Sequence, residues 1–195
     1  MNRTWNFEKG AWQAEDFLSA ASSRVEYRLT FGQKDDCIHN EGADKMDEYA
    51  YVSMVHRTPV SLPCLLETEC SFRTYGAPLL ILADAVDTLP DGRLQYGHHI
   101  EVVGWEKGIN VWDLTPDPEA PNGQRTVNLG RFSFPIEDGA RFLLTARADR
   151  QGLVVGAEVN GRSAQFDCPC VLPEKCYVGI TACEGENYFY RFSIR

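Results

Sequence analysis

The sequence predicts an all-β protein, built as an antiparallel two-sheet jelly-roll sandwich. Short runs of alternating apolar and polar residues follow one another along almost the whole chain. Turn residues separate these runs, as at Asn160-Gly161, a dipeptide typical of a type I′ hairpin turn. The chain has 195 residues, of which 44% are hydrophobic, enough for two stacked sheets to share one core. We therefore expect a single β-sandwich domain over residues 1–195.

Roughly a dozen strands are expected, at the short and regular spacing of a sandwich or barrel. Their expected positions are residues 25–31, 48–56, 63–72, 77–83, 126–134, 141–148, 153–160, 163–167, 176–183 and 188–194, together with a hairpin at 96–114. The run at 77–83 is apolar throughout, which predicts a strand buried on both faces. The single helix candidate is the weakly periodic segment 13–21.

The hairpin at 96–114 is the most informative segment, and a turn at Glu106-Lys107-Gly108 joins its two strands. If Lys107 and Gly108 form the loop, Trp105 lies opposite Asn110. Side chains alternate along a strand, so two faces with different compositions result. One face carries His99, Glu101, Trp105, Asn110 and Trp112, and the other carries Ile100, Val102, Ile109 and Val111.

The first of these faces combines flat aromatic rings with hydrogen-bonding groups, a surface suited to sugar rings. The indoles of Trp105 and Trp112 could stack on pyranose faces, while the polar neighbours orient hydroxyl groups. The alternative is that both indoles fill the space between the two sheets. A three-residue loop would also break the grouping, because a one-residue slip reverses every side chain.

Composition excludes several classes of partner. The formal net charge of −9 argues against nucleic acid, whose phosphates require clustered Lys and Arg. No apolar run has the length of a membrane span or a signal peptide, so we expect no membrane partner and a cytoplasmic location. Seven cysteines, an odd number, are expected to be reduced thiols there.

The strand order, the Gly104-Trp105 hairpin and the closing strand NYFYRFSIR together resemble the concanavalin A-like lectin and glucanase superfamily, especially small galectin-like bacterial domains of unknown function. This resemblance implies a concave sheet that holds carbohydrate, as in lectins, hydrolases or lyases. The Glu-x-Asp-x-x-Glu strand of the retaining endoglucanases is absent. The His-x-Asn-x-Arg and Trp-Gly-x-Glu pattern of galectins is not reproduced at His99-Ile100-Glu101 or Trp105-Glu106. The resemblance therefore favours carbohydrate without naming a reaction.

Three glutamates are the candidates for catalysis. Glu67 and Glu69 lie two positions apart on one strand face, with Cα atoms about 6.5–7 Å apart. Glu101 could join them from a neighbouring strand and supply the acid and base of a glycoside hydrolase or polysaccharide lyase. The alternative is that Glu67 and Glu69 are solvated on an outer face.

No metal site or cofactor is predicted. Cys168-Pro169-Cys170, with Cys176 and Cys183, lacks the spacing of zinc knuckles, so structural thiols are expected. The carboxylates of Asp84, Asp87 and Asp91 lie in one loop without the ordered spacing of a calcium site. A solvated turn is expected there, and calcium between residues 84 and 91 is left open.

Taken together, the sequence predicts a lectin-like sandwich that binds an intracellular saccharide. A glycoside hydrolase or polysaccharide lyase is the first alternative. The second is a protein-interaction module whose exposed aromatic residues meet a protein partner. A homodimer is left open.

Overall fold

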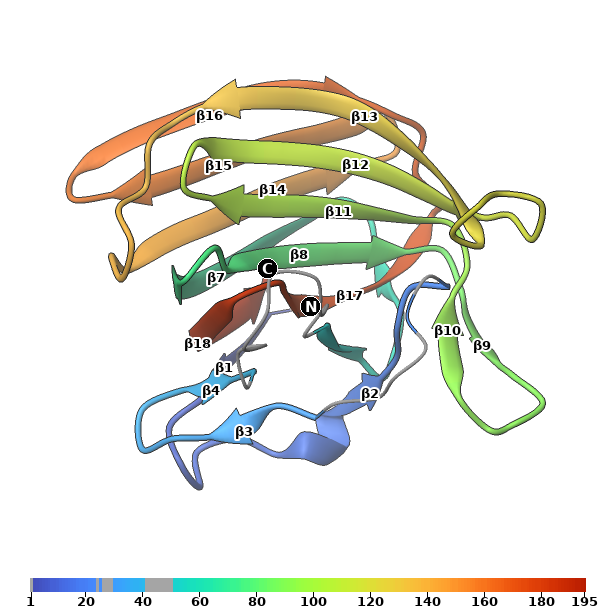
Figure 1. The fold of residues 1–195 in the computed structure, drawn as a ribbon, viewed down its shortest axis with the longest axis horizontal. Coiled ribbons are helices and arrows are strands. Elements are labelled where there is room, and N and C mark those ends of the chain that lie inside the picture. The colour runs from blue at the N-terminus through green and yellow to red at the C-terminus, as the bar shows by residue number, and fades with distance from the viewer. Residues whose placement is uncertain (1, 24, 26–29, 41–50) are drawn as a thin grey trace.

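Two antiparallel β-sheets stack face to face in the computed structural model, which describes residues 2–23, 25, 30–40 and 51–195 (Figure 1). Sheet A contains, in spatial order, β16 (Arg162–Pro169), β15 (Gly152–Val159), β14 (Phe142–Asp149), β7 (Cys64–Arg73), β18 (Glu186–Ile194), β4 (Ile38–His39) and β3 (Gly32–Gln33), and β1 (Arg3–Asn6) pairs with β18. Sheet B contains β13 (Gln124–Ser133), β12 (Gly108–Pro116), β11 (His99–Trp105), β8 (Ala77–Ala83), β17 (Lys175–Cys183), β5 (Val52–His56) and β2 (Phe17–Ser19), and β6 (Val60–Ser61) pairs with β17. A separate hairpin is formed by β9 (Val86–Thr88) and β10 (Leu94–Tyr96).

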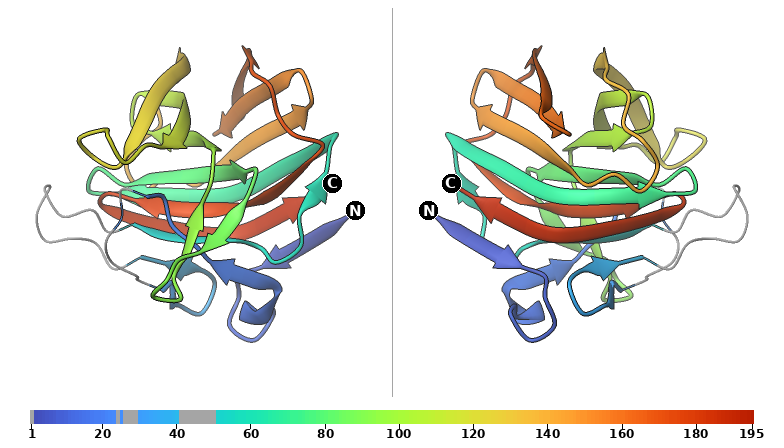
Figure 2. Two further views of the ribbon diagram at one scale, coloured as in Figure 1. Left: turned by 90° about the vertical axis from the view of Figure 1, so that its right-hand side faces the viewer. Right: turned by 90° about the vertical axis from the view of Figure 1, so that its left-hand side faces the viewer.

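The two ends of the chain lie side by side, as both views in Figure 2 show. Arg3 of β1 pairs with Ile194 of β18, so the first and last strands are neighbours in sheet A. The β9–β10 hairpin extends beyond the end of sheet B (Figure 1). It lies next to the N-terminal segment, since Ala21 forms a parallel bridge with Gln95.

The predicted fold class is confirmed, and most of the predicted strands are present with similar bounds. β8 is buried along its whole length, as the apolar run at 77–83 predicted. The described part of the strand expected at 48–56 is β5. The strand expected at 25–31 lies mostly outside the described residues.

The predicted helix at 13–21 is wrong. A single 3-10 turn at Ala14–Asp16 leads directly into strand β2. Phe17 pairs with His56 of β5 and packs edge-on against Trp5, with ring centroids 5.0 Å apart. These long-range contacts outweigh the weak helical periodicity of the segment.

The main core fills the space between the sheets. Alternation sends Ile100 and Val102 of β11 into this core, where both are fully buried with Leu144 of β14. Each such side chain contributes about 1.5–3 kcal/mol through burial. Phe132 of β13 and Phe166 of β16 close one edge of the core by stacking, with ring centroids 6.0 Å apart. The opposite face of sheet B is therefore free to carry other groups.

Free thiols are found at Cys37, Cys64, Cys70, Cys168, Cys170 and Cys176, and all of these except Cys170 are buried. Burial raises the pKa of the Cys176 thiol from 9.0 to about 12, and burial raises that of Cys64 to about 11. Both thiols therefore stay protonated in the folded protein at pH values where they ionise in the unfolded chain.

This difference predicts a loss of stability at alkaline pH. The unfolded chain releases its thiol protons first, so stability falls as the pH rises from about 9 towards the folded-state pKa values. At pH 10, Cys176 alone accounts for about 1 kcal/mol of this loss. Urea unfolding at pH 8 and pH 10 measures it, and Cys176→Ala is expected to make the pH dependence shallower. An unchanged pH dependence in this variant would contradict the prediction.

Among the described residues, no helix has the length and apolar composition needed to cross a membrane.

Candidate functional site

The hairpin formed by β11 and β12 has a register different from the predicted one. Trp105 pairs with Gly108 and Val103 pairs with Asn110, so the loop is Glu106-Lys107. The predicted pairing of Trp105 with Asn110 is therefore wrong by two residues. A two-residue shift keeps each side chain on its face, because the side-chain period of a strand is two.

The five predicted binding residues consequently share the outer face of sheet B, the face directed away from sheet A. They are His99, Glu101, Trp105, Asn110 and Trp112. Their neighbours Ile100, Val102, Ile109 and Val111 occupy the core between the sheets. Trp105 and Trp112 are half-buried on the outer face, so neither indole fills the space between the sheets.

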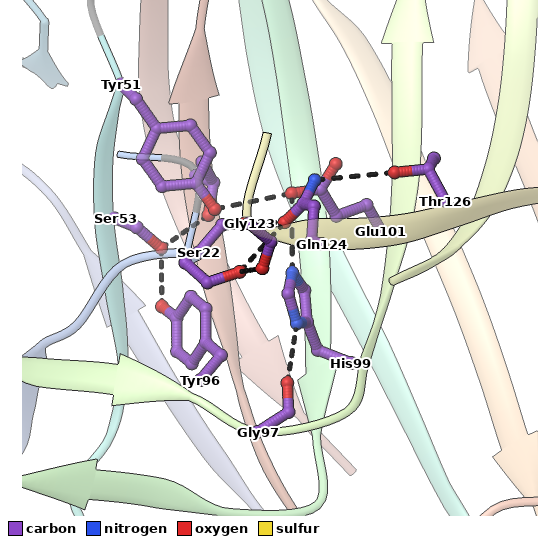
Figure 3. A network of polar contacts seen from close by, with 12 residues as sticks. Ser22, Tyr51, Ser53, Tyr96, Gly97, His99, Glu101, Gly123, Gln124 and Thr126 are labelled. Atoms are coloured by element: carbon purple, nitrogen blue, oxygen red, sulfur yellow. Dashed lines mark hydrogen bonds and ion pairs between the residues drawn. The ribbon is translucent and has the colours of Figure 1, made fainter. Parts of the chain in front are cut away.

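His99 and Glu101 are not accessible, because their exposed fractions are only 1% and 2%. The Nδ1–H of His99 donates to the carbonyl oxygen of Gly97 at 2.9 Å. Its Nε2 lies 3.8 Å from Glu101 Oε1 and has no hydrogen-bond partner. The hydroxyl of Tyr51 donates to the same carboxylate oxygen at 3.3 Å (Figure 3).

A second group of polar side chains continues this arrangement. The Tyr96 hydroxyl bonds to Ser53 Oγ at 2.5 Å, and Ser53 Oγ bonds to Thr181 Oγ1 at 2.5 Å. We refer to Tyr51, Ser53, Tyr96, His99, Glu101 and Thr181 as the polar layer. All six are buried, and burial raises the pKa of the Tyr96 hydroxyl, so the layer is a closed internal network.

The segment Ala20–Ser23, called the covering segment below, closes this network from outside. The backbone N–H of Tyr96 donates to the Ala21 carbonyl oxygen at 2.9 Å. At the edge strand β13 of the same sheet, Ser22 Oγ donates a hydrogen bond to Gln124 Oε1 at 2.5 Å (Figure 3). Ala21 also packs in the cluster that contains Trp112. The covering segment thus divides the outer face of sheet B into a covered part and an open part.

The open part lies on the outermost strands, β11 to β13. Arg131 of β13 is exposed, and its Nε–H donates to Asn110 Oδ1 at 3.0 Å. The Arg131 guanidinium carbon lies 5.9 Å from the Trp105 ring centroid, and Lys107 Nζ lies 5.3 Å from it. We refer to Trp105, Asn110, Trp112, Asn128 and Arg131 as the edge patch.

Asn128 and Arg131 were missed by the sequence analysis. They are three positions apart, so a regular strand would direct them to opposite faces. A bulge opposite Val111 and Trp112 inserts Leu129, after which Asn128 pairs with Trp112 and Arg131 pairs with Asn110. No local signal in the sequence marks this extra residue.

The structure does not bring the three candidate catalytic glutamates together. Glu67 and Glu69 lie on β7, on the outer face of sheet A, whereas Glu101 lies on the outer face of sheet B. Glu67 pairs with Arg195, and Glu69 lies 3.8 Å from Arg141 Nη1. The whole sandwich therefore separates Glu101 from the other two carboxylates.

Within the described part of the chain, no three or more His, Cys, Asp or Glu side chains form a group that could hold a metal ion. Asp91 instead accepts a hydrogen bond from Arg93 Nε at 2.5 Å in the turn between β9 and β10.

Comparison with solved structures identifies the fold. No protein-family model matches the sequence, and no curated protein is a significant match. The structure is similar to the carbohydrate-binding module CBM66 from Bacillus subtilis, with a TM-score of 0.60 and 10% identity over 89% of this chain and 91% of that chain. It is also similar to the lectin UEA-II complexed with galactose, with a TM-score of 0.58 and 9% identity over 100% of this chain and 97% of that chain. The chain has the concanavalin A-like lectin fold.

The metal-free exoplasmic/lumenal domain of VIP36 shares this lectin fold, with a TM-score of 0.58 and 12% identity over 100% of this chain and 92% of that chain. The predicted resemblance is thus confirmed for the fold. Within the lectin fold, the candidate site of this chain is the edge patch, and the polar layer beside it is internal.

Proposed function

We propose that the protein binds carbohydrate through the edge patch, without a catalytic role for the glutamates. The observation that carries this proposal is the pair of half-buried indoles, Trp105 and Trp112, that share the outer face of sheet B. Asn110 and Arg131 lie beside them and supply hydrogen-bonding groups. The fold shared with a carbohydrate-binding module and a galactose-bound lectin supports the same ligand class.

The chemistry of the patch suits a sugar ring. The C–H groups on one face of a pyranose can pack on the electron-rich face of an indole. Amide and guanidinium groups at the rim bond to hydroxyl groups and so fix the orientation of the ring. His99 and Glu101 then act from beneath the surface, by holding β11 in place rather than by touching the ligand.

The ligand we propose is an intracellular saccharide. The free thiols of Cys37, Cys64, Cys70, Cys168, Cys170 and Cys176 support this location, because thiols persist unpaired where the environment is reducing. Thermal-shift screening against mono- and oligosaccharides tests the proposal, since a ligand that binds the native state raises the Tm.

Removing either indole is expected to weaken saccharide binding about tenfold, because an aromatic contact of this kind contributes roughly 0.5–1.5 kcal/mol beyond its buried area. The test is calorimetric titration of Trp105→Ala and Trp112→Ala with the saccharide that gives the largest thermal shift. Tyr75→Ala is the control, because Tyr75 is 62% exposed in the turn between β7 and β8, outside the edge patch. Wild-type affinity in both tryptophan variants would show that the saccharide binds elsewhere on the protein.

A further inference from the structure

We propose that the edge patch selects anionic saccharides, with Arg131 holding a carboxylate or sulfate group while a sugar ring stacks on Trp105. This inference rests on the proposed function and adds the chemical class of the ligand. It is carried by the position and the bonding of one arginine.

Arg131 is held in place but its charge is not neutralised. Asn110 is only 8% exposed, and its Oδ1 accepts a hydrogen bond from Arg131 Nε at 3.0 Å. The two residues are paired across strands β12 and β13. In the part of the chain that the structure describes, Arg131 forms no ion pair. No carboxylate of the described residues therefore lies within ion-pair distance of its two terminal nitrogens.

Some other arginines of this acidic protein are paired with carboxylates. Arg141 Nη2 lies 2.6 Å from Asp36 Oδ2, Arg93 Nε lies 2.5 Å from Asp91, and Arg3 lies 3.8 Å from Asp16. The chain has 28 acidic and 19 basic residues, so carboxylates are abundant on it. Other exposed arginines, such as Arg147, also form no ion pair with the described residues. Arg131 differs from Arg147 because its guanidinium is bonded to the buried Asn110 and lies beside the Trp105 ring.

The surroundings of Arg131 suit an anion on a sugar ring. Trp105 has two cations near its ring, Arg131 and Lys107. Lys107 is balanced by Glu106, with Nζ and Oε1 3.5 Å apart, so Arg131 carries the net positive charge. A guanidinium binds a carboxylate or sulfate through two parallel hydrogen bonds, which are about twice as strong as neutral ones. Because the amide of Asn110 already fixes the guanidinium, less side-chain entropy is lost on binding.

Matched saccharide pairs test this selectivity on the full chain. Oligogalacturonate is compared with its methyl ester, oligoalginate with its propylene glycol ester, and κ-carrageenan oligosaccharide with its desulfated form. We expect the anionic member of at least one pair to bind ten or more times tighter, less so at higher salt. The pair that shows the difference distinguishes a carboxylate from a sulfate.

Two variants test whether Arg131 causes the preference for the anionic saccharide. Arg131→Gln is expected to bind both members of that pair equally, with an unchanged Tm. Arg147→Gln removes an exposed arginine on β14 of sheet A and is expected to retain the full preference. Equal or tighter wild-type binding of the neutral members, or a preference that survives Arg131→Gln, overturns the charge selectivity and leaves carbohydrate binding standing. Binding of none of the six saccharides overturns the charge selectivity, whereas carbohydrate binding itself is overturned only if the whole thermal-shift panel gives no ligand.

Discussion

Replacing Glu101 by alanine is expected to lower the free energy of unfolding by about 2–5 kcal/mol. The carboxylate is buried, lies 3.8 Å from His99 Nε2 and accepts a hydrogen bond from Tyr51. Alanine would leave a cavity and remove the acceptor of a buried hydroxyl, and each of these changes is destabilising.

Urea unfolding measures this effect, and the Tm is expected to fall by roughly 10 °C at this chain length. Glu101→Gln keeps the shape and one acceptor oxygen, so it should cost less and retain saccharide binding at low temperature. Glu158→Ala on the exposed face of β15 is the control and should stay within about 0.5 kcal/mol of wild type. A Glu101→Ala variant as stable as the control would show that the polar layer does not hold the sheet.

Gly108→Ala is expected to destabilise the protein by about 3 kcal/mol or more, the upper range for an overpacked site. Gly108 has a φ of +139°, and a Cβ there would overlap the carbonyl oxygen of Phe132 and approach the Phe134 nitrogen. Both obstacles are backbone atoms, which cannot turn aside as a side chain can. The hairpin would have to move away from β13, so Trp105 and Asn110 would change their position relative to Arg131 of β13.

A second hairpin glycine gives a matched control for this variant. Gly161 also has a positive φ, +72°, but nothing lies within 4 Å of the position its Cβ would take. Gly161→Ala should therefore cost only the backbone strain, about 1–2 kcal/mol. Thermal unfolding compares the two variants, and saccharide titration should show lost affinity for Gly108→Ala only. Equal losses of stability in the two variants would show that crowding of the Gly108 Cβ position against Phe132 and Phe134 does not destabilise the protein.

The sequence predicts the fold and the faces of its strands well, because alternation is a local property. The grouping of His99 with Trp105 and Trp112 survived a wrong register, since the error was an even number of residues. The helix at 13–21 failed because Phe17 belongs to a sheet whose partner strand, β5, lies far along the chain.

Accessibility could not be predicted in the same way. Alternation tells which side of sheet B carries His99 and Glu101, but it does not tell what lies over that side. The covering segment is about eighty positions earlier in the chain, in a stretch whose own pattern indicated a helix. Arg131 was missed because a single bulged residue, Leu129, decides which face it occupies.

The bond between Ser22 and Gln124 joins residues that are 102 positions apart. During translation at about 5–20 residues per second, Ser22 is made roughly 5–20 s before its acceptor exists. The nascent N-terminus must therefore wait while later strands emerge and pair. The hydrogen bond that fastens Ala20–Ser23 to β13 can therefore form only after residue 124 has been made.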